Sequence, residues 1–142
     1  MTRKFLLAFL ALSVSLVLQA WLAGAGIFLD LSFATLIALA FFLDFLELLT
    51  LALGVAFVLN WQPAPSATLA FLAGYPCLIH LLYRLAPWQI WIMIPAAIVV
   101  GFTALLFVAA PGSFAAAPGL FFGDLFAGIL FGYLAFFSLA RA

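Results

Sequence analysis

The sequence predicts an all-α fold, a polytopic membrane bundle of transmembrane helices, from three observations. Hydrophobic residues make up 71% of the chain and charged residues only 6%, so polar groups could not cover the surface of a water-soluble domain. The apolar runs are long and do not alternate with polar residues, which favours helices over barrel strands. The 142 residues suffice for a single integral membrane domain, residues 1–142, of five or six helices.

Short polar or proline-containing breaks divide the chain into apolar runs. The predicted helices cover residues 5–25, 28–43, 46–60, 67–83, 88–109 and 119–140. Prolines and polar residues at 60–66, 85–89 and 110–119 are typical of the loops between helices. Trp61 and Trp88 lie in two of these loops, which suits side chains at a membrane–water interface.

The first apolar run follows two basic residues, Arg3 and Lys4. A positive start before an apolar run is shared by cleaved secretory signal peptides and by retained first helices. We favour retention of residues 5–25, because the run is long enough to span a membrane and another apolar segment follows at once. Both interpretations place the basic end of this run in the cytoplasm.

The stretch 27–60 decides the number of membrane crossings. It contains no proline and no basic residue, and as one helix it would be about 50 Å long against a hydrocarbon core of about 30 Å. It therefore forms either one long, tilted helix or two short helices that turn back near Asp44 and Glu47. The first alternative gives five crossings and the second gives six.

The basic residues favour six crossings. They are Arg3, Lys4, Arg84 and Arg141. With a turn near Asp44, all four lie on the cytoplasmic side together with the N- and C-termini, whereas five crossings would place Arg84 and Arg141 outside. Because cytoplasmic loops carry an excess of Lys and Arg, we predict six transmembrane helices, with five as the alternative. The short helices would then have to thin the bilayer or pack inside the bundle.

Four ionisable residues are predicted to lie at the same depth near the cytoplasmic side. They are Asp44, Glu47, His80 and Arg84. The favoured interpretation is a cytoplasmic ionic cluster that joins the second, third and fourth helices, and the alternative is a proton or substrate relay. One histidine and two carboxylates without motif spacing do not predict a metal site.

Asp124, Gly128 and Gly132 recur every four residues and therefore share one stripe of the last helix. The two glycines form a small-xxx-small pattern that allows another helix to approach closely. Lipid exposure of Asp124 at mid-membrane would cost about 2.5–3.5 kcal/mol, so the stripe is expected to face protein. It serves either helix packing within the bundle or an interface with a partner protein.

Gly74-Tyr75-Pro76 lies midway along the predicted helix 67–83. Pro76 removes one backbone hydrogen bond and is expected to kink or unwind the helix. Broken helices line ligand cavities in transporters, so Tyr75, Pro76 and Cys77 are candidates for a cavity lining, with a simple kink as the alternative. Cys77 is the single cysteine, which excludes an internal disulfide.

Catalytic patterns are absent from the sequence. The serines are scattered without a histidine at a suggestive spacing, and no glycine-rich phosphate loop or zinc-protease motif is present. The chain also lacks a basic patch for nucleic acid. We therefore expect a non-enzymatic protein without a cofactor, whose partners are the lipid bilayer and other membrane proteins.

The order of the segments resembles a known family. A basic start precedes a helix with Leu18-Gln19 near its end, Leu29-Asp30-Leu31 opens a second apolar helix, and a third helix ends in residues 54–60. This layout resembles the MreD family, six-helix proteins of the bacterial rod-shape and cell-wall elongation system. Leu29 and Asn60 stand where that family often has proline and aspartate. The family's fold is similar to that of the substrate-binding S components of vitamin transporters.

Three hypotheses for the function follow. By resemblance, the chain acts through helix–helix contacts in the bacterial inner membrane, as an MreD-like component of the cell-shape machinery. The alternative is the substrate-binding component of a small-solute, vitamin-type transporter, with a small-molecule ligand. The third is an ion or proton channel that uses Asp44, Glu47 and Asp124.

Overall fold

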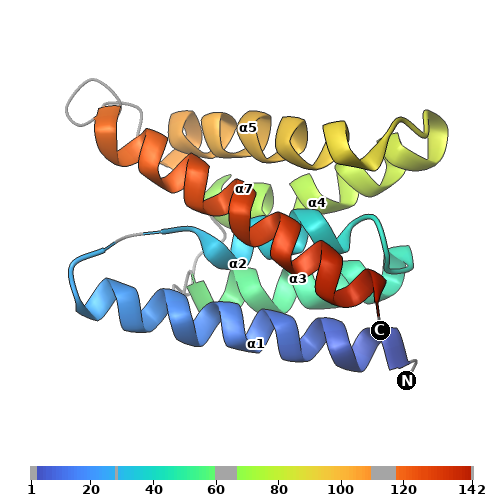
Figure 1. The fold of residues 1–142 in the computed structure, drawn as a ribbon, viewed down its shortest axis with the longest axis horizontal. Coiled ribbons are helices and arrows are strands. Elements are labelled where there is room, and N and C mark those ends of the chain that lie inside the picture. The colour runs from blue at the N-terminus through green and yellow to red at the C-terminus, as the bar shows by residue number, and fades with distance from the viewer. Residues whose placement is uncertain (1–2, 28, 60–66, 110–117, 142) are drawn as a thin grey trace.

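The computed structural model describes residues 3–27, 29–59, 67–109 and 118–141. All regular structure in these ranges is α-helical, which confirms the predicted all-α fold class. The helices are α1 (Arg3–Gly24), α2 (Leu31–Leu39), α3 (Phe45–Leu59), α4 (Ala67–Leu85), α5 (Ile90–Ala109) and α7 (Pro118–Ala140). They pack into one bundle, in which α1 begins and α7 ends at the same end (Figure 1).

The short helix α2 forms the centre of the bundle. All nine of its residues are buried, and it packs against α1, α3, α4, α5 and α7. A helix that is apolar on every face must be enclosed by other elements. The buried Thr35 side chain is accommodated by polar contacts, since its hydroxyl donates to the carbonyl of Leu31 at 2.9 Å and lies 2.8 Å from the Ser15 hydroxyl of α1.

The structure divides the stretch 27–60 into α2 and α3, which are joined by a turn at residues 40–44. The second helix is shorter than the predicted range 28–43, because it begins only after the N-cap residue Asp30 and ends at Leu39, before the turn. Nine residues make a helix of about 14 Å, compared with about 33 Å for α1. The N-terminus of α2 therefore lies inside the bundle and not at its end.

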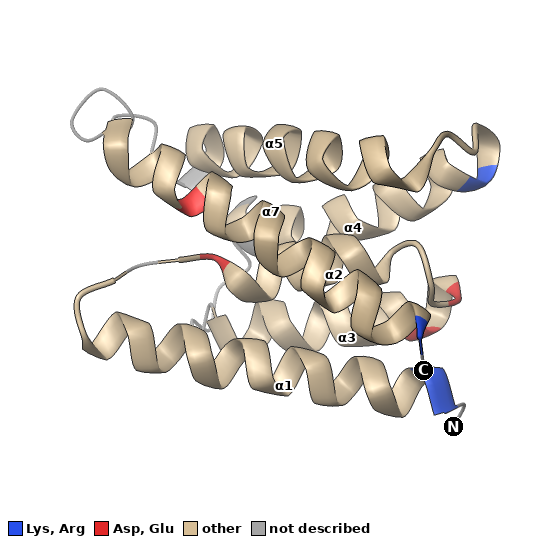
Figure 2. Cartoon of the chain, in the orientation of Figure 1, with Lys and Arg blue, Asp and Glu red and all other residues tan. Residues whose placement is uncertain are grey.

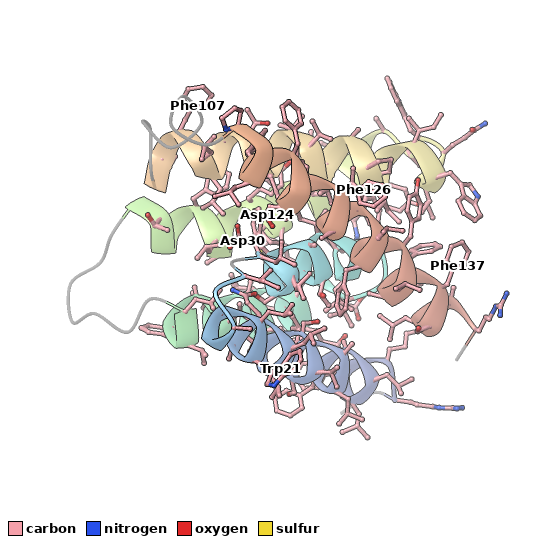
Figure 3. The ribbon with its side chains drawn as sticks, turned by 60° about the vertical axis from the view of Figure 1, so that its left-hand side comes forward. Trp21, Asp30, Phe107, Asp124, Phe126 and Phe137 are labelled. Carbon is pink, nitrogen blue, oxygen red and sulfur yellow. The ribbon has the colours of Figure 1, made fainter. Side chains whose placement is uncertain are left out.

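Among the described residues, three helices are long and apolar enough to cross a membrane, namely α1, α5 and α7, while α3 and α4 contain shorter apolar helices. Their outer surfaces carry large apolar side chains: Trp21 is 71% exposed and Phe107 is 67% exposed. Figure 3 shows both side chains on the outside of the bundle, whereas Asp30 and Asp124 lie between the helices. This distribution fits a protein surrounded by lipid, because water would solvate such a surface poorly.

Helix α4 remains one helix through Pro76, so of the two expected outcomes, a kink or an unwinding, the unwinding does not occur. Proline removes only one backbone donor, and a helix can continue past it when its neighbours hold it in place. Pro76 is fully buried, and the adjacent Tyr75 and Cys77 are 7% exposed. The helix therefore continues past Pro76 at a position where the proline and its two neighbours are enclosed by other residues.

Candidate functional site

The chain folds back into the bundle after α1. Gly26 has a φ angle of +83°, a conformation that favours glycine, and its amide donates to the carbonyl of Ala23 at 3.0 Å. The amide of Ile27 donates to the carbonyl of Leu22 at 2.9 Å. These bonds satisfy carbonyl groups in the last turn of α1, and the left-handed backbone conformation of Gly26 ends the helix.

The N-terminus of α2 is capped by a side chain from another helix. Asp30 occupies the N-cap position but makes no side-chain capping hydrogen bond. Instead, Gln19 Oε1 of α1 accepts from the Ser32 amide at 3.0 Å and from the Ser32 hydroxyl at 2.7 Å. Because Ser32 is fully buried, these donors need a protein acceptor. Gln19 takes over the capping role and leaves the Asp30 carboxyl available for other contacts.

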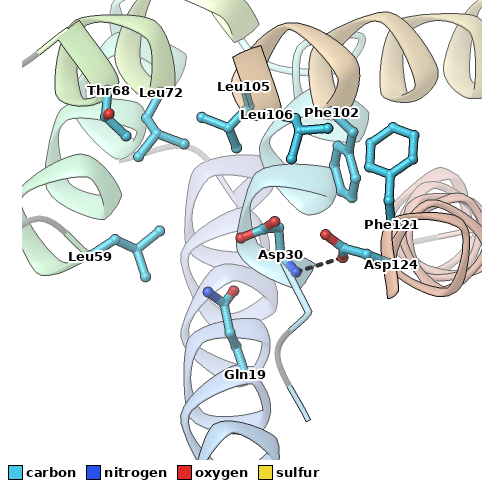
Figure 4. Close-up of a pocket in the computed structure, with 10 residues that line it drawn as sticks. All are labelled: Gln19, Asp30, Leu59, Thr68, Leu72, Phe102, Leu105, Leu106, Phe121 and Asp124. Atoms are coloured by element: carbon cyan, nitrogen blue, oxygen red, sulfur yellow. Dashed lines mark hydrogen bonds between the residues drawn. The ribbon is translucent and has the colours of Figure 1, made fainter. Parts of the chain in front are cut away.

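Asp124 of α7 holds the same end of α2 from the opposite side. Its Oδ1 accepts a hydrogen bond from the Asp30 amide at 2.9 Å. Two aspartates that are 94 residues apart in the sequence thus meet at the N-terminus of α2. Figure 4 shows them side by side, with Gln19 below them. We call Asp30, Ser32, Gln19 and Asp124 the inner polar centre.

A pocket of about 350 Å³ opens beside the inner polar centre. It is lined by Gln19, Asp30, Leu59, Thr68, Leu72, Phe102, Leu105, Leu106, Phe121 and Asp124 (Figure 4). Its walls come from α1, α3, α4, α5 and α7 and from the N-cap of α2. A few convergent polar groups among apolar and aromatic walls are typical of small-molecule sites, and the volume falls in their range. We call this the polar pocket.

The polar pocket has an acidic character. Two carboxyl groups, one amide and one hydroxyl line it, and no basic side chain does. The basic residues Arg3, Lys4, Arg84 and Arg141 lie at the opposite end of the bundle (Figure 2), which we call the basic end. No described group of three or more His, Cys, Asp or Glu residues could hold a metal ion. The carboxyl groups in the lining are complementary to a cationic or donor-rich solute.

The structure places Gly128 and Gly132 against neighbouring helices. A Cβ atom at Gly128 would lie 2.8 Å from Phe102 Cζ, and one at Gly132 would lie 2.7 Å from Ile98 Cδ1. Both positions thus allow α7 to approach α5 closely within the bundle. Asp124 begins the same stripe, but its carboxyl serves the inner polar centre and not helix packing alone.

The predicted ionic cluster is assembled only in part. Arg84 Nη2 lies 3.6 Å from Asp44 Oδ1, with the two side chains 62% and 79% exposed. His80 does not point to this pair: its Nδ1 donates to the carbonyl of Ala40 at 2.8 Å, and the side chain is 4% exposed. His80 therefore holds the turn after α2 from inside the bundle.

The expected cavity at Tyr75, Pro76 and Cys77 is largely filled. The Tyr75 hydroxyl donates to the carbonyl of Ala97 at 2.6 Å, and its ring packs on Phe33 and against the Cα of Gly101. Tyr75 also borders an open, apolar groove between α4 and α5. None of the three residues lines the polar pocket.

Asp30 and Gln19 were not predicted as site residues. A usable signal was present, because each is a polar residue flanked by apolar neighbours and such residues inside a membrane bundle need partners. Their partners are 94 and 13 residues away, and no local periodicity connects them. Thr68 likewise stands at the start of a helix, with no motif around it.

Together these features define the class of this protein as an all-helical bundle with three helices able to cross a membrane and an acidic pocket at an internal helix end. Comparisons with protein-family models, curated proteins and solved structures find no match for the chain. The function is therefore argued from the site alone.

Proposed function

We propose that the chain crosses the bacterial inner membrane six times, with both termini in the cytoplasm. The gathering of Arg3, Lys4, Arg84 and Arg141 at the basic end supports this orientation (Figure 2), because basic residues are retained on the cytoplasmic side. Helix α2 is too short to cross alone, so in this topology the chain between the end of α1 and Leu31 covers the rest of the crossing.

Within this topology, we propose that the protein is the solute-binding component of a small-molecule transport system. The observation that carries the proposal is the polar pocket, where Asp30 and Asp124 meet beside a helix end inside an apolar bundle. Ionisable groups at such depth are costly and mark ligand or ion paths. Transporters also build their sites at helix ends inside the membrane, and α2 begins inside the bundle.

The acidic lining indicates the class of solute. An ammonium or a protonated heterocycle would pair with the carboxyl groups of Asp30 and Asp124, while Phe102 and Phe121 would cover its apolar part. The Gln19 amide and the Thr68 hydroxyl supply further hydrogen-bonding groups. The proposed ligand is a small organic cation, such as a quaternary ammonium compound or a cationic vitamin.

Thermal unfolding of the purified protein in mild detergent tests this proposal. Organic cations should raise the melting temperature, since a ligand at one hundred times its Kd stabilises the folded state by about 2.7 kcal/mol. Anionic solutes of similar size should have no effect. D30N and D124N should abolish the shift, and D44N, which removes a carboxyl at the basic end, should retain it. A cation panel without any shift, or loss of the shift in D44N, would contradict the proposal.

A second candidate function is an MreD-like role through contacts with other membrane proteins. Its support is a groove of about 540 Å³ between α1 and α3, in addition to the segment layout. Ser13, Thr50 and Gly54 line it, and the two hydroxyls donate to carbonyls of their own helices at 2.8 Å. Small residues with satisfied polar groups allow a transmembrane helix to approach closely.

Site-directed cross-linking in native membranes tests this second function. In a C77A background, a cysteine at Gly54 should cross-link to a membrane protein of the cell-shape machinery. A cysteine at Phe107, on the outer surface of α5, is the matched control and should not cross-link. Equal products from both positions, or a solitary monomer, would remove the basis for the MreD-like role.

A further inference from the structure

A second cavity lies at the basic end of the bundle, on the side opposite the polar pocket. It has a volume of about 370 Å³ and is formed by the start of α1, the end of α2 with the following turn, and the end of α7. Arg3 and Lys4 lie at its edge. Its floor is apolar and belongs to the core, since Ala8 and Leu39 are fully buried and Leu43 is 3% exposed.

The charges of this cavity have one sign. No acidic side chain is among the residues that line it, and neither Asp44 nor Arg84, which pair with each other, belongs to the lining. Arg141 follows α7, whose last residues complete the wall, and adds a third positive charge at the same end of the bundle (Figure 2). Cationic groups above an apolar floor are complementary to an amphipathic anion.

We infer that this cavity binds an anionic phospholipid, with the headgroup phosphate at Arg3 and Lys4 and an acyl chain over the apolar floor. The inference rests on the proposed membrane orientation but not on solute binding in the polar pocket. Basic pockets between transmembrane helices on the cytoplasmic side hold such headgroups. Basic residues that only set the orientation of the protein in the membrane need nothing but their charge. That role does not explain why three segments enclose a cavity beside them.

Lipid binding to the purified protein in detergent micelles tests the inference, because the orientation of the protein in a membrane then has no effect. Phosphatidylglycerol and phosphatidylcholine with identical acyl chains are titrated, and the bound lipid is counted by native mass spectrometry. Phosphatidylglycerol should bind at least about tenfold more tightly, given the contribution of each basic residue near an anionic headgroup. Equal retention of the two lipids would overturn the inference.

Three variants separate the cavity from general charge attraction. R3Q/K4Q should lower the affinity for phosphatidylglycerol about tenfold, and A140F should do the same by filling the cavity without changing charge. R84Q removes a charge at the same end outside the lining and should leave the affinity within about twofold. An R84Q effect as large as that of single R3Q, or an A140F variant that binds normally, would contradict the site.

Inorganic phosphate and D124N complete the design. Phosphate that displaces phosphatidylglycerol would show a free-anion site and overturn the lipid assignment. D124N changes the polar pocket and the inner polar centre but no residue that lines the cavity at the basic end, so it should leave lipid retention unchanged even if organic cations never bind. Only variants whose melting temperature in phosphatidylcholine equals that of the unchanged protein are compared. The single variants R3Q and K4Q replace the double variant if it fails to fold.

Discussion

Polar side chains at the two ends of the bundle are held in different ways. The inner polar centre lies between helices, where Gln19 and Asp124 accept three hydrogen bonds of 2.7–3.0 Å from the start of α2. At the basic end, Asp44 and Arg84 form an exposed pair at 3.6 Å. Polar groups at the inner end thus complete a helix that starts inside the bundle, whereas Asp44 and Arg84 at the basic end remain available to solvent or headgroups.

Replacing Gln19 should produce the largest loss of stability. Q19L leaves the Ser32 amide and hydroxyl without their acceptor at a fully buried position, which costs about 1–3 kcal/mol for each unsatisfied group. The free energy of unfolding, measured by denaturant titration in mixed micelles, should fall accordingly. Gln89 is exposed before α5, so Q89L serves as the control, and equal losses in both variants would refute the capping role.

Removal of the Asp124 acceptor should have the next largest effect. D124A deprives the Asp30 amide of its 2.9 Å hydrogen bond and should reduce stability by about 1 kcal/mol or more. D124N keeps a carbonyl oxygen at the same position and should retain most of that stability. Thermal unfolding of the two variants in parallel distinguishes them. If D124N were as unstable as D124A, the charge of Asp124 and not its acceptor would hold α2.

The Ser15–Thr35 contact should contribute less, although it is fully buried. Each hydroxyl also has a carbonyl acceptor within its own helix, at 2.7 Å for Ser15 and 2.9 Å for Thr35. A double-mutant cycle with S15A and T35V should therefore give a coupling energy of about 0.6 kcal/mol, the average for such bonds in membrane proteins. A coupling energy larger than the loss of stability in Q19L would mean that the Ser15–Thr35 contact stabilises the bundle more than the Gln19 cap does.

The Asp44–Arg84 pair should have the smallest effect. Because both side chains are more than half exposed, the coupling energy from D44N and R84Q should be at most about 1 kcal/mol. Added salt should reduce it further through screening. The same salt titration on D124N and D124A should leave their difference unchanged. A salt-insensitive coupling at the basic end would mean that this pair is shielded from solvent in the folded protein.

Several residues of the site could not be predicted from the sequence, for physical reasons. The sequence identifies Asp124 as a site candidate because a carboxyl in an apolar helix is costly, and Asp124 lines the polar pocket. Asp30 and Gln19 have the same character but no partner at helical spacing. The four-residue distance to Arg84 predicts that His80 joins the ionic cluster, but its ring faces the carbonyl of Ala40. Spacing along one helix cannot decide which neighbouring backbone a side chain meets.

The sequence by itself determined the helical class, the apolar outer surface and the positions of its few charges. These follow from composition and from the length of apolar runs, which act locally along the chain. Only the tertiary structure decided that α2 is a nine-residue helix enclosed on every side and that its N-terminus is completed by Gln19 and Asp124. Hydrogen-bond donors buried at a helix end must find acceptors, and which residues supply them depends on how distant helices pack.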